Sequence, residues 1–224
     1  MKEAIRSAIL SLGADVCGFA EVGRFTQAPT GYSPLDLLPS CRSVIVFGIA
    51  LPEGLIHTDR GVLYAHFQRQ NMDAINRIAL TASKILEAQY RCICLPLPAD
   101  VPYESWDADR MHGRALLSVK HAAVLAGLGF LGENTLLIHP EFGNRLTPGM
   151  ILTSLPLEGD APCSGACDPR CGKCIKACPV GAIHDGIVEQ KLCRQHAYGS
   201  AGKGFPTILC NTCRRVCPLG HGKR

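Results

Sequence analysis

The chain has 224 residues, is 47% hydrophobic and carries a formal net charge of +4 at pH 7. That length allows one domain of ordinary size plus a small addition, and no stretch approaches the roughly eighteen uninterrupted apolar residues of a membrane span. The N-terminus has no apolar signal-peptide core, so we expect a cytoplasmic protein without a membrane partner.

The first part of the chain predicts alternating helices and strands. Apolar residues at helical spacing predict an amphipathic helix over residues 2–12, ended by Gly13. A short strand is expected over Val16–Ala20, and the proline-containing stretch 24–40 is expected to be a loop. Ser43–Leu51 is a continuous apolar run, which is typical of a central strand buried on both faces.

The same alternation continues to residue 155. We expect helices over 62–90 and 115–126 and strands over 91–95 and 150–155, and this pattern indicates an α/β domain. The four cysteines of this part are expected to be core thiols: Cys17, Cys41, Cys92 and Cys94.

A glycine-punctuated stretch, KHAAVLAGLGFLGENTLLI and onward to Arg145, joins a predicted helix to a strand. Glycines allow positive φ and close backbone approach, so such a turn can admit a large planar or phosphate-bearing cofactor. Glycines also end helices for purely structural reasons. A dinucleotide fold is not indicated, because its glycine fingerprint follows a strand. The candidate cofactor contacts are Lys120, His121, Gly127, Gly129, Gly132, Asn134, Thr135, Gly143 and Arg145.

Nine of the thirteen cysteines lie between Cys163 and Cys217, in an order typical of two [4Fe–4S] clusters. Two C-x2-C-x3-C-P runs flank a solitary Cys193, and the cysteine before each proline is expected to ligate the other cluster. One cluster would therefore take Cys167, Cys171, Cys174 and Cys217, and the other would take Cys178, Cys193, Cys210 and Cys213. Cys163 is a second claimant for the place of Cys167.

Other uses of these cysteines fit the pattern less well. Zinc sites use separable four-ligand knuckles and give no reason for the two prolines, and disulfides would need an oxidising compartment. Residues 163–224 hold ten Lys/Arg against three Asp/Glu, a net charge of +7. Two clusters with their thiolates would cancel about −4 of it, so nucleic-acid binding is a minority interpretation of this basic segment.

Short apolar flanks around Asp185-Gly186 predict a hairpin. The glycine-rich insert over residues 195–206 is expected to loop past one cluster. The chain is expected to divide near Leu155–Pro162, where the apolar run ends and the cysteine block begins.

The stretch KHAAVLAGLGFLGENTLLIHPEFGNRLTPGMILTSLPLE, followed by the doubled cysteine motif, resembles the corrinoid-dependent epoxyqueuosine reductase family. That family is related to reductive dehalogenases and to the cobalamin-processing chaperone. The resemblance implies a nitroreductase-like α/β domain that binds cobalamin over residues 1–158. It also implies a small ferredoxin-like α+β domain with two [4Fe–4S] clusters over residues 159–224.

Two departures from the family bear on its activity. The family's general-acid aspartate position is held by Gly113, and the chain stops at Arg224, where that family continues into a tRNA-gripping repeat module. We therefore expect a cobalamin-dependent iron–sulfur reductase of a small molecule, with tRNA an unlikely partner and a low-potential ferredoxin or flavodoxin as electron donor. The alternatives are an electron-transfer protein or corrinoid reductase without an organic substrate, and a cobalamin-trafficking module.

The loop that enters the helix at residue 115 offers replacement proton donors beside the single tryptophan, Trp106. His112 is the first choice, because it adjoins Gly113 and the reference pKa of histidine is near neutral. A plain solvated loop is an equal alternative. The candidate catalytic residues are His112, Asp107, Asp109 and Tyr103.

Overall fold

A computed structural model describes residues 1–168 and 170–222 of the chain. Its centre is a four-stranded sheet in the order β1 (Val16–Glu21), β2 (Ser43–Ala50), β8 (Leu146–Thr153) and β3 (Cys94–Leu97). The strands come from an alternating series of helices and strands, as the sequence predicts, and all three pairings are antiparallel. The pairing of β2 with β8 is the longest and runs from Ser43–Thr153 to Ala50–Leu146.

The apolar run of β2 is buried on both faces of this sheet, which confirms the predicted central strand. Side chains of a strand alternate between faces, and here Ile45 and Phe47 belong to one core while Val44 and Val46 belong to the other. All four have 0% of their surface exposed. Two separate hydrophobic cores therefore meet at this one strand.

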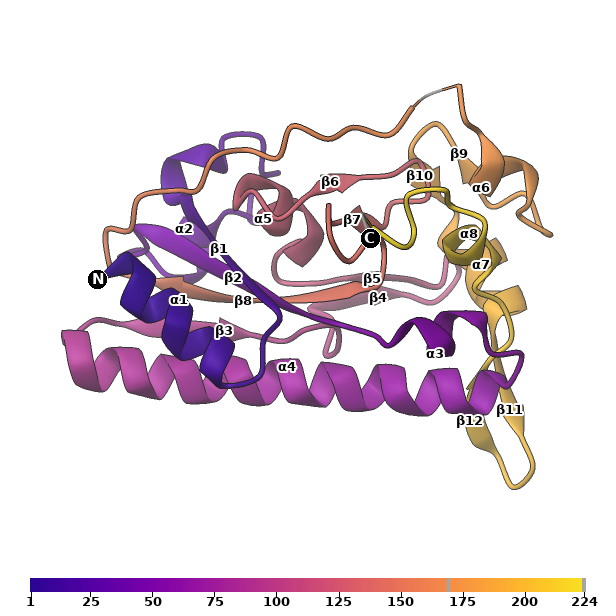
Figure 1. The fold of residues 1–224 in the computed structure, drawn as a ribbon, viewed down its shortest axis with the longest axis horizontal. Coiled ribbons are helices and arrows are strands. Elements are labelled where there is room, and N and C mark those ends of the chain that lie inside the picture. The colour runs from indigo at the N-terminus through magenta and orange to yellow at the C-terminus, as the bar shows by residue number, and fades with distance from the viewer. Residues whose placement is uncertain (169, 223–224) are drawn as a thin grey trace.

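Helices cover both faces of the sheet (Figure 1). The long helix α4 (Gly61–Tyr90) and the N-terminal helix α1 (Lys2–Ser11) lie on the Ile45 face, and α5 (Val119–Leu125) lies on the opposite face. Gly149 in β8 allows α4 to approach closely, because a Cβ there would collide with Ile75 of α4 and with Phe47. A glycine at this position thus sets how near the helix lies to the sheet.

Several helices and strands begin or end at other residues than the sequence predicts. The strand β3 begins at Cys94 rather than at residue 91, and β8 begins at Leu146 rather than at residue 150. The predicted loop 24–40 contains a short helix, α2 (Pro34–Leu37), and a 3-10 turn, η1 (Val22–Arg24), precedes it. A capping box explains α2, because Ser33 and Asp36 exchange side-chain and backbone hydrogen bonds at its start.

The helix predicted over 115–126 begins only at Val119. Residues before it form a hairpin of β4 (Ser105–Asp107) and β5 (His112–Arg114), and a second hairpin of β6 (Phe130–Leu131) and β7 (Leu137–Ile138) follows it. The β4–β5 hairpin and the β6–β7 hairpin both hold residues that were expected in loops or turns. The short helix α3 (Glu53–His57) joins β2 to α4.

The C-terminal part contains short helices and two hairpins. In chain order its elements are α6 (Lys173–Lys176), β9 (Ile183–His184), β10 (Ile187–Val188), α7 (Gln190–Ala197), β11 (Tyr198–Ala201), β12 (Phe205–Ile208) and α8 (Thr212–Arg215). Antiparallel pairing of β9 with β10 confirms the predicted hairpin, in which Asp185 and Gly186 both have positive φ. The insert over residues 195–206, for which the sequence indicated no element, contains most of a β11–β12 hairpin that glycines 202 and 204 turn and that packs against α4; its passage past a cluster stays a prediction.

The C-terminal part is tied back to the rest of the chain at two places. Asn144 Nδ2 donates to the carbonyl of Arg214 at 3.0 Å, and the amide of Asn144 donates to Gly220 at 3.2 Å. Near the start of this part, Asp160 accepts hydrogen bonds from Arg6 of α1 and from the amide of Phe19. No helix of the described residues is both long and apolar enough to cross a membrane.

Candidate functional site

Four cysteines line one cavity, and we call them the first thiol set: Cys167, Cys171, Cys174 and Cys217. The cavity has a volume of about 320 Å³, and Gly132, Asn134 and Ile138 of the glycine-punctuated stretch form part of its wall. Burial raises the pKa of the Cys174 thiol, and negative charge at Cys167 and Cys217 raises it further. Cys163 is not among the residues that line this cavity.

The remaining four cysteines of the two runs form the second thiol set: Cys178, Cys193, Cys210 and Cys213. Burial raises the pKa of Cys193, and the charges of Cys178 and Cys210 add to the increase. Burial likewise raises the pKa of Cys213 to about 11, with contributions from Cys193, Cys210 and also Cys174 of the first set. The interaction between Cys174 and Cys213 indicates that the two sets are neighbours.

The thiols within each set are spread more widely than one zinc ion requires. In the part of the chain that the structure describes, no three cysteine sulfurs all lie within 4.8 Å of one another. A tetrahedral zinc site with Zn–S bonds of about 2.3 Å would hold its sulfurs about 3.8 Å apart. Burial raises the pKa of Cys174, Cys193, Cys213 and Cys217, so a metal that binds these four thiols has to displace their protons.

The glycine-punctuated stretch packs against the thiol sets rather than standing apart from them. Asn134 is 4% exposed, and its Nδ2 donates to the carbonyl of Cys213 at 3.1 Å. Gly127 and Gly129 have positive φ, and a Cβ at either would collide with a backbone carbonyl, of Ala161 or of Ile138 respectively. These two glycines are required by the chain's own packing, so by themselves they do not indicate a cofactor.

Three basic side chains gather around this stretch. Lys120 Nζ donates to the carbonyl of Thr135 at 2.8 Å. Burial lowers the pKa of Lys120, and the positive charge of Arg214 lowers it further. Arg145 donates from Nη1 to the carbonyl of Leu51 at 2.8 Å, while its buried Nε makes no hydrogen bond to the described residues. Arg214 was not among the predicted contacts, although its place directly after Cys213 was a signal for it.

The other predicted cofactor contacts have local partners. His121 Nδ1 lies 2.7 Å from Ser118 Oγ, and burial followed by the charge of Lys120 lowers its pKa. Gly143 has positive φ and lies against the backbone of Gly220. Gly132 lines the cavity of the first thiol set. Gly132, Asn134 and Gly143 therefore face the C-terminal part of the chain, whereas the hydrogen-bond partner of His121 is the neighbouring Ser118.

Three of the four candidate proton donors, Asp107, Asp109 and His112, lie on the β4–β5 hairpin instead of a loop, and Tyr103 precedes it. Asp107 and His112 are directly paired across it, and both are exposed, as is Asp109 in the turn. Asp107 also accepts a hydrogen bond from the amide of Arg110 at 3.0 Å. The ring of Tyr103 fills the space where a side chain at Gly113 would lie. An aspartate could not replace Gly113 without moving Tyr103.

Arg194 fastens this hairpin to the second thiol set, and the sequence analysis did not single it out. Its guanidinium lies 5.3 Å from the ring centre of Trp106 and 5.8 Å from that of Tyr198, and Nη2 donates to the hydroxyl of Tyr103 at 3.1 Å. Arg194 directly follows Cys193. The hairpin and the second thiol set are thus linked by one side chain.

Comparison with protein-family models gives no match. Among curated proteins, an epoxyqueuosine reductase of Bacillus anthracis is 35% identical over 205 residues, which are 85% of this chain and 51% of that protein. An epoxyqueuosine reductase of Bacillus subtilis is 25% identical over 262 residues, covering 100% of this chain and 64% of the relative. The chain spans about half to two thirds of the length of these relatives.

Solved structures have the same mixed α/β fold. An epoxyqueuosine reductase with an epoxyqueuosine-modified tRNA-Tyr stem loop matches with a TM-score of 0.64 and 22% identity, over 99% of this chain and 66% of that chain. A reductive dehalogenase, whose structure suggests a mechanism for B12-dependent dehalogenation, matches with a TM-score of 0.63 and 18% identity, over 97% and 32%.

These comparisons contradict two expectations from the sequence. The expected substrate was a small molecule other than epoxyqueuosine in tRNA, yet the curated relatives are named for epoxyqueuosine reduction. The expectation that tRNA is an unlikely partner is contradicted in the same way, because a neighbour of this fold is solved with a modified tRNA stem loop. Both expectations rested on Gly113 and on the position of the last residue, and neither feature defines a substrate.

Proposed function

The chain is an epoxyqueuosine reductase-like protein, and from that premise we propose that it reduces the epoxide of epoxyqueuosine in tRNA. The proposal gives the two thiol sets one [4Fe–4S] cluster each and places a corrinoid beside the glycine-punctuated stretch. The observation that carries the proposal is that the glycine-punctuated stretch contacts both thiol sets. Gly132 and Asn134 line the cavity of the first set, and Asn134 also donates to the carbonyl of Cys213 in the second. Electrons would leave the clusters at this contact.

The thiol sets fit iron–sulfur clusters by their chemistry. Each offers four cysteine sulfurs, which is the usual ligand number of a [4Fe–4S] cluster. Cys174 and Cys213 interact across the two sets, so the two clusters would be close enough to exchange electrons. Reduction of an epoxide consumes two electrons and two protons, and two one-electron centres match that need.

The basic side chains around the glycine-punctuated stretch fit the anionic tail of a corrinoid. Lys120 is half-buried near the like charge of Arg214, and the negative charge of Asp100 offsets these effects only in part, so a bound anion would stabilise the charged ammonium. Arg145 Nε, buried and without a hydrogen bond among the described residues, is available to the same ligand. A bound corrinoid supplies the cobalt centre that passes electrons to the substrate.

Protons for the reaction would come from the β4–β5 hairpin. Cross-strand partners have Cβ atoms about 5 Å apart, so Asp107 is placed to orient the imidazole of His112. In the proposal His112 donates a proton to the epoxide oxygen as a C–O bond breaks. Arg194 acts as a positioning residue, because it fixes the hairpin through Tyr103 and Trp106.

The test is turnover by the full chain under anaerobic conditions. Protein reconstituted with iron, sulfide and cobalamin is mixed with a chemical reductant and a tRNA stem loop that contains epoxyqueuosine, and the nucleosides are analysed by mass spectrometry. We expect loss of the epoxide oxygen from the modified nucleoside. A protein with full iron and bound corrinoid that leaves the stem loop unchanged would overturn the proposed activity.

Two variants separate the parts of the proposal. His112→Gln should lower the rate at least about tenfold, the lower end of what a general acid contributes, with unchanged iron and corrinoid. Arg114→Gln, at an exposed position of the same hairpin, serves as the matched control. Equal rates for His112→Gln and the native chain would remove His112 from proton transfer. If the native chain does not retain cobalamin, the corrinoid part of the proposal is refuted.

A further inference from the structure

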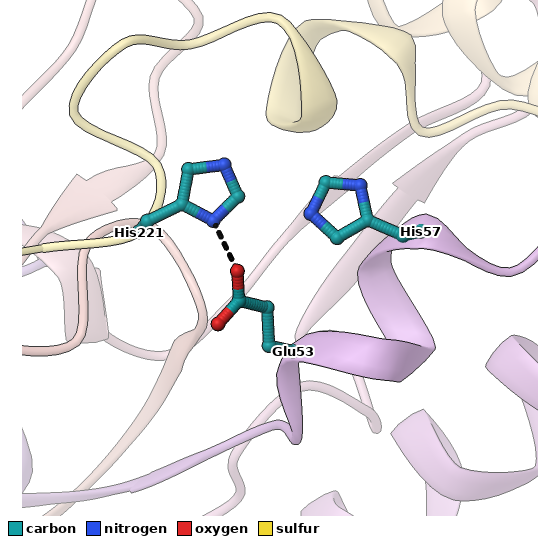
Figure 2. A group of neighbouring side chains, drawn as sticks. All are labelled: Glu53, His57 and His221. Atoms are coloured by element: carbon teal, nitrogen blue, oxygen red, sulfur yellow. Dashed lines mark ion pairs between the residues drawn. The ribbon is translucent and has the colours of Figure 1, made fainter.

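Three side chains that could hold a metal ion, none of them a member of the thiol sets or of the β4–β5 hairpin, lie close together. Glu53 and His57 project from α3, and His221 comes from the C-terminal turn (Figure 2). One ligand atom from each residue lies within 4.8 Å of the others. His221 Nδ1 is 3.0 Å from Glu53 Oε1, and the two imidazole rings are stacked 5.1 Å apart at an interplanar angle of 10°.

The backbone fixes this arrangement from both sides. Glu53 and His57 are four residues apart in one helix, so they share a face. Asn211 Nδ2 donates to the carbonyl of Ile56 at 3.0 Å and thereby holds α3 against the start of α8. The turn that carries His221 is closed by a hydrogen bond from the amide of Gly220 to Cys217 at 2.9 Å.

The orientation of His221 favours a shared ion over a simple hydrogen bond. Its Nδ1 is buried and close to the Glu53 carboxylate, yet it has no hydrogen bond of acceptable geometry among the described residues. A short distance between His221 Nδ1 and Glu53 Oε1 without hydrogen-bond alignment is expected when the lone pairs of both atoms point at one metal position. His57 is exposed, whereas Glu53 and His221 are half-buried, so solvent reaches the group from the side of His57.

We propose that Glu53, His57 and His221 bind one divalent transition-metal ion of the zinc class. Two imidazole nitrogens and one carboxylate oxygen are a donor set that such ions accept, with water in the fourth position. In a tetrahedral site with bonds of about 2.0–2.1 Å the ligand atoms lie about 3.4 Å apart. Small side-chain rotations reach that geometry from the observed spacing.

The site has a structural consequence for the first thiol set. His221 lies four residues after Cys217, and the ion would fasten this segment to α3. Binding would therefore hold Cys217 in place at the cavity that it lines. The inference does not rest on the proposed function, since it uses residues outside the thiol sets, the glycine-punctuated stretch and the hairpin.

The experiment measures Zn²⁺ binding by the iron-loaded full chain. Protein with its iron content determined is dialysed anaerobically against graded Zn²⁺, and bound zinc is counted by mass spectrometry. We expect one zinc ion per chain in the native protein. His57→Ala and Glu53→Gln should each weaken binding more than about tenfold, at unchanged iron content. His184→Ala is the matched control, because His184 lies 3.7 Å from Asp185 on a surface hairpin without a third ligand.

Thermal unfolding provides the second measurement. Zinc should raise the unfolding temperature of the native chain and of His184→Ala but not of His57→Ala. If His221→Ala loses iron, its zinc binding does not report on this site alone. His57→Ala and Glu53→Gln then test the zinc site, because they change only its α3 side. Equal zinc affinity in the native chain and in both α3 variants, or no zinc bound by the native chain, would overturn the inference.

Discussion

Paired serine substitutions test whether the two thiol sets are interleaved along the chain. Cys174 and Cys217 belong to the same set although they are 43 residues apart, whereas Cys174 and Cys178, only four residues apart, belong to different sets. A sequential arrangement, in which each C-x2-C-x3-C-P run holds its own cluster, makes the opposite assignment. The iron content of two double variants therefore distinguishes the two arrangements.

The expected iron content of each double variant follows from which thiol set each of its two cysteines belongs to. The native chain should hold about eight iron atoms. Cys174→Ser with Cys217→Ser removes two ligands from one set and leaves the other complete, so about four iron atoms should remain. Cys174→Ser with Cys178→Ser removes one ligand from each set, and the iron content should fall well below four, with little of either cluster left.

The assay is iron and labile sulfide per chain after anaerobic reconstitution, with absorption spectra of the same samples. Cys163→Ser provides the control, because Cys163 is not among the residues that line the cavity of the first set. Retention of about four iron atoms by the Cys174/Cys178 variant and loss of nearly all iron by the Cys174/Cys217 variant would refute interleaving.

Three further predictions concern contacts that hold the parts of the chain together. Burial alone would raise the pKa of Asp160, but hydrogen bonds from Lys2 and Arg6 lower it. Asp160→Asn should therefore lower the free energy of unfolding by about 1–2 kcal/mol at pH 7. The difference from the native chain should shrink as pH falls below about 4, which denaturant titration at several pH values measures. Gly61→Ala places a Cβ against the Ile208 carbonyl and should lower the free energy of unfolding by about 1–3 kcal/mol, whereas Gly54→Ala, whose Cβ would have no atom within 4 Å, should not lower it, because alanine favours a helix over glycine; chemical denaturation measures both. Arg194→Ala should shift the emission of Trp106 to longer wavelength, because the ring loses its guanidinium contact, and an unchanged spectrum would contradict that contact.

The elements that could be predicted from sequence are those with a strong local signal. The run Ser43–Leu51 has only apolar side chains apart from its first residue and one glycine, so burial on both faces was the single outcome consistent with it. Asp185-Gly186 specified its hairpin because both residues accept positive φ. The cysteine spacing predicted two interleaved ligand sets. Four of these cysteines line one cavity, and their assignment to clusters stays a prediction.

The parts that could not be predicted depend on contacts between distant residues. The β4–β5 hairpin lacks an alternating apolar pattern, and its stability comes from Arg194, about ninety residues later in the chain. Glu53 and His221 are 168 residues apart, and no local pattern links them. The expectation against tRNA was wrong for a related reason: a missing acid at one position does not exclude a proton donor delivered by another residue on the same hairpin.

The interleaving of the thiol sets has a consequence for the synthesis of the protein. The first three thiols of the first set leave the ribosome before Cys217 has been translated, because 43 residues separate Cys174 from Cys217. At about 5–20 residues per second those thiols wait for several seconds, near one another and without their fourth member. In the proposed interleaved arrangement, the first set can therefore take up its complete cluster only after Cys217 has been translated, and its first three thiols are open to oxidation in the interval.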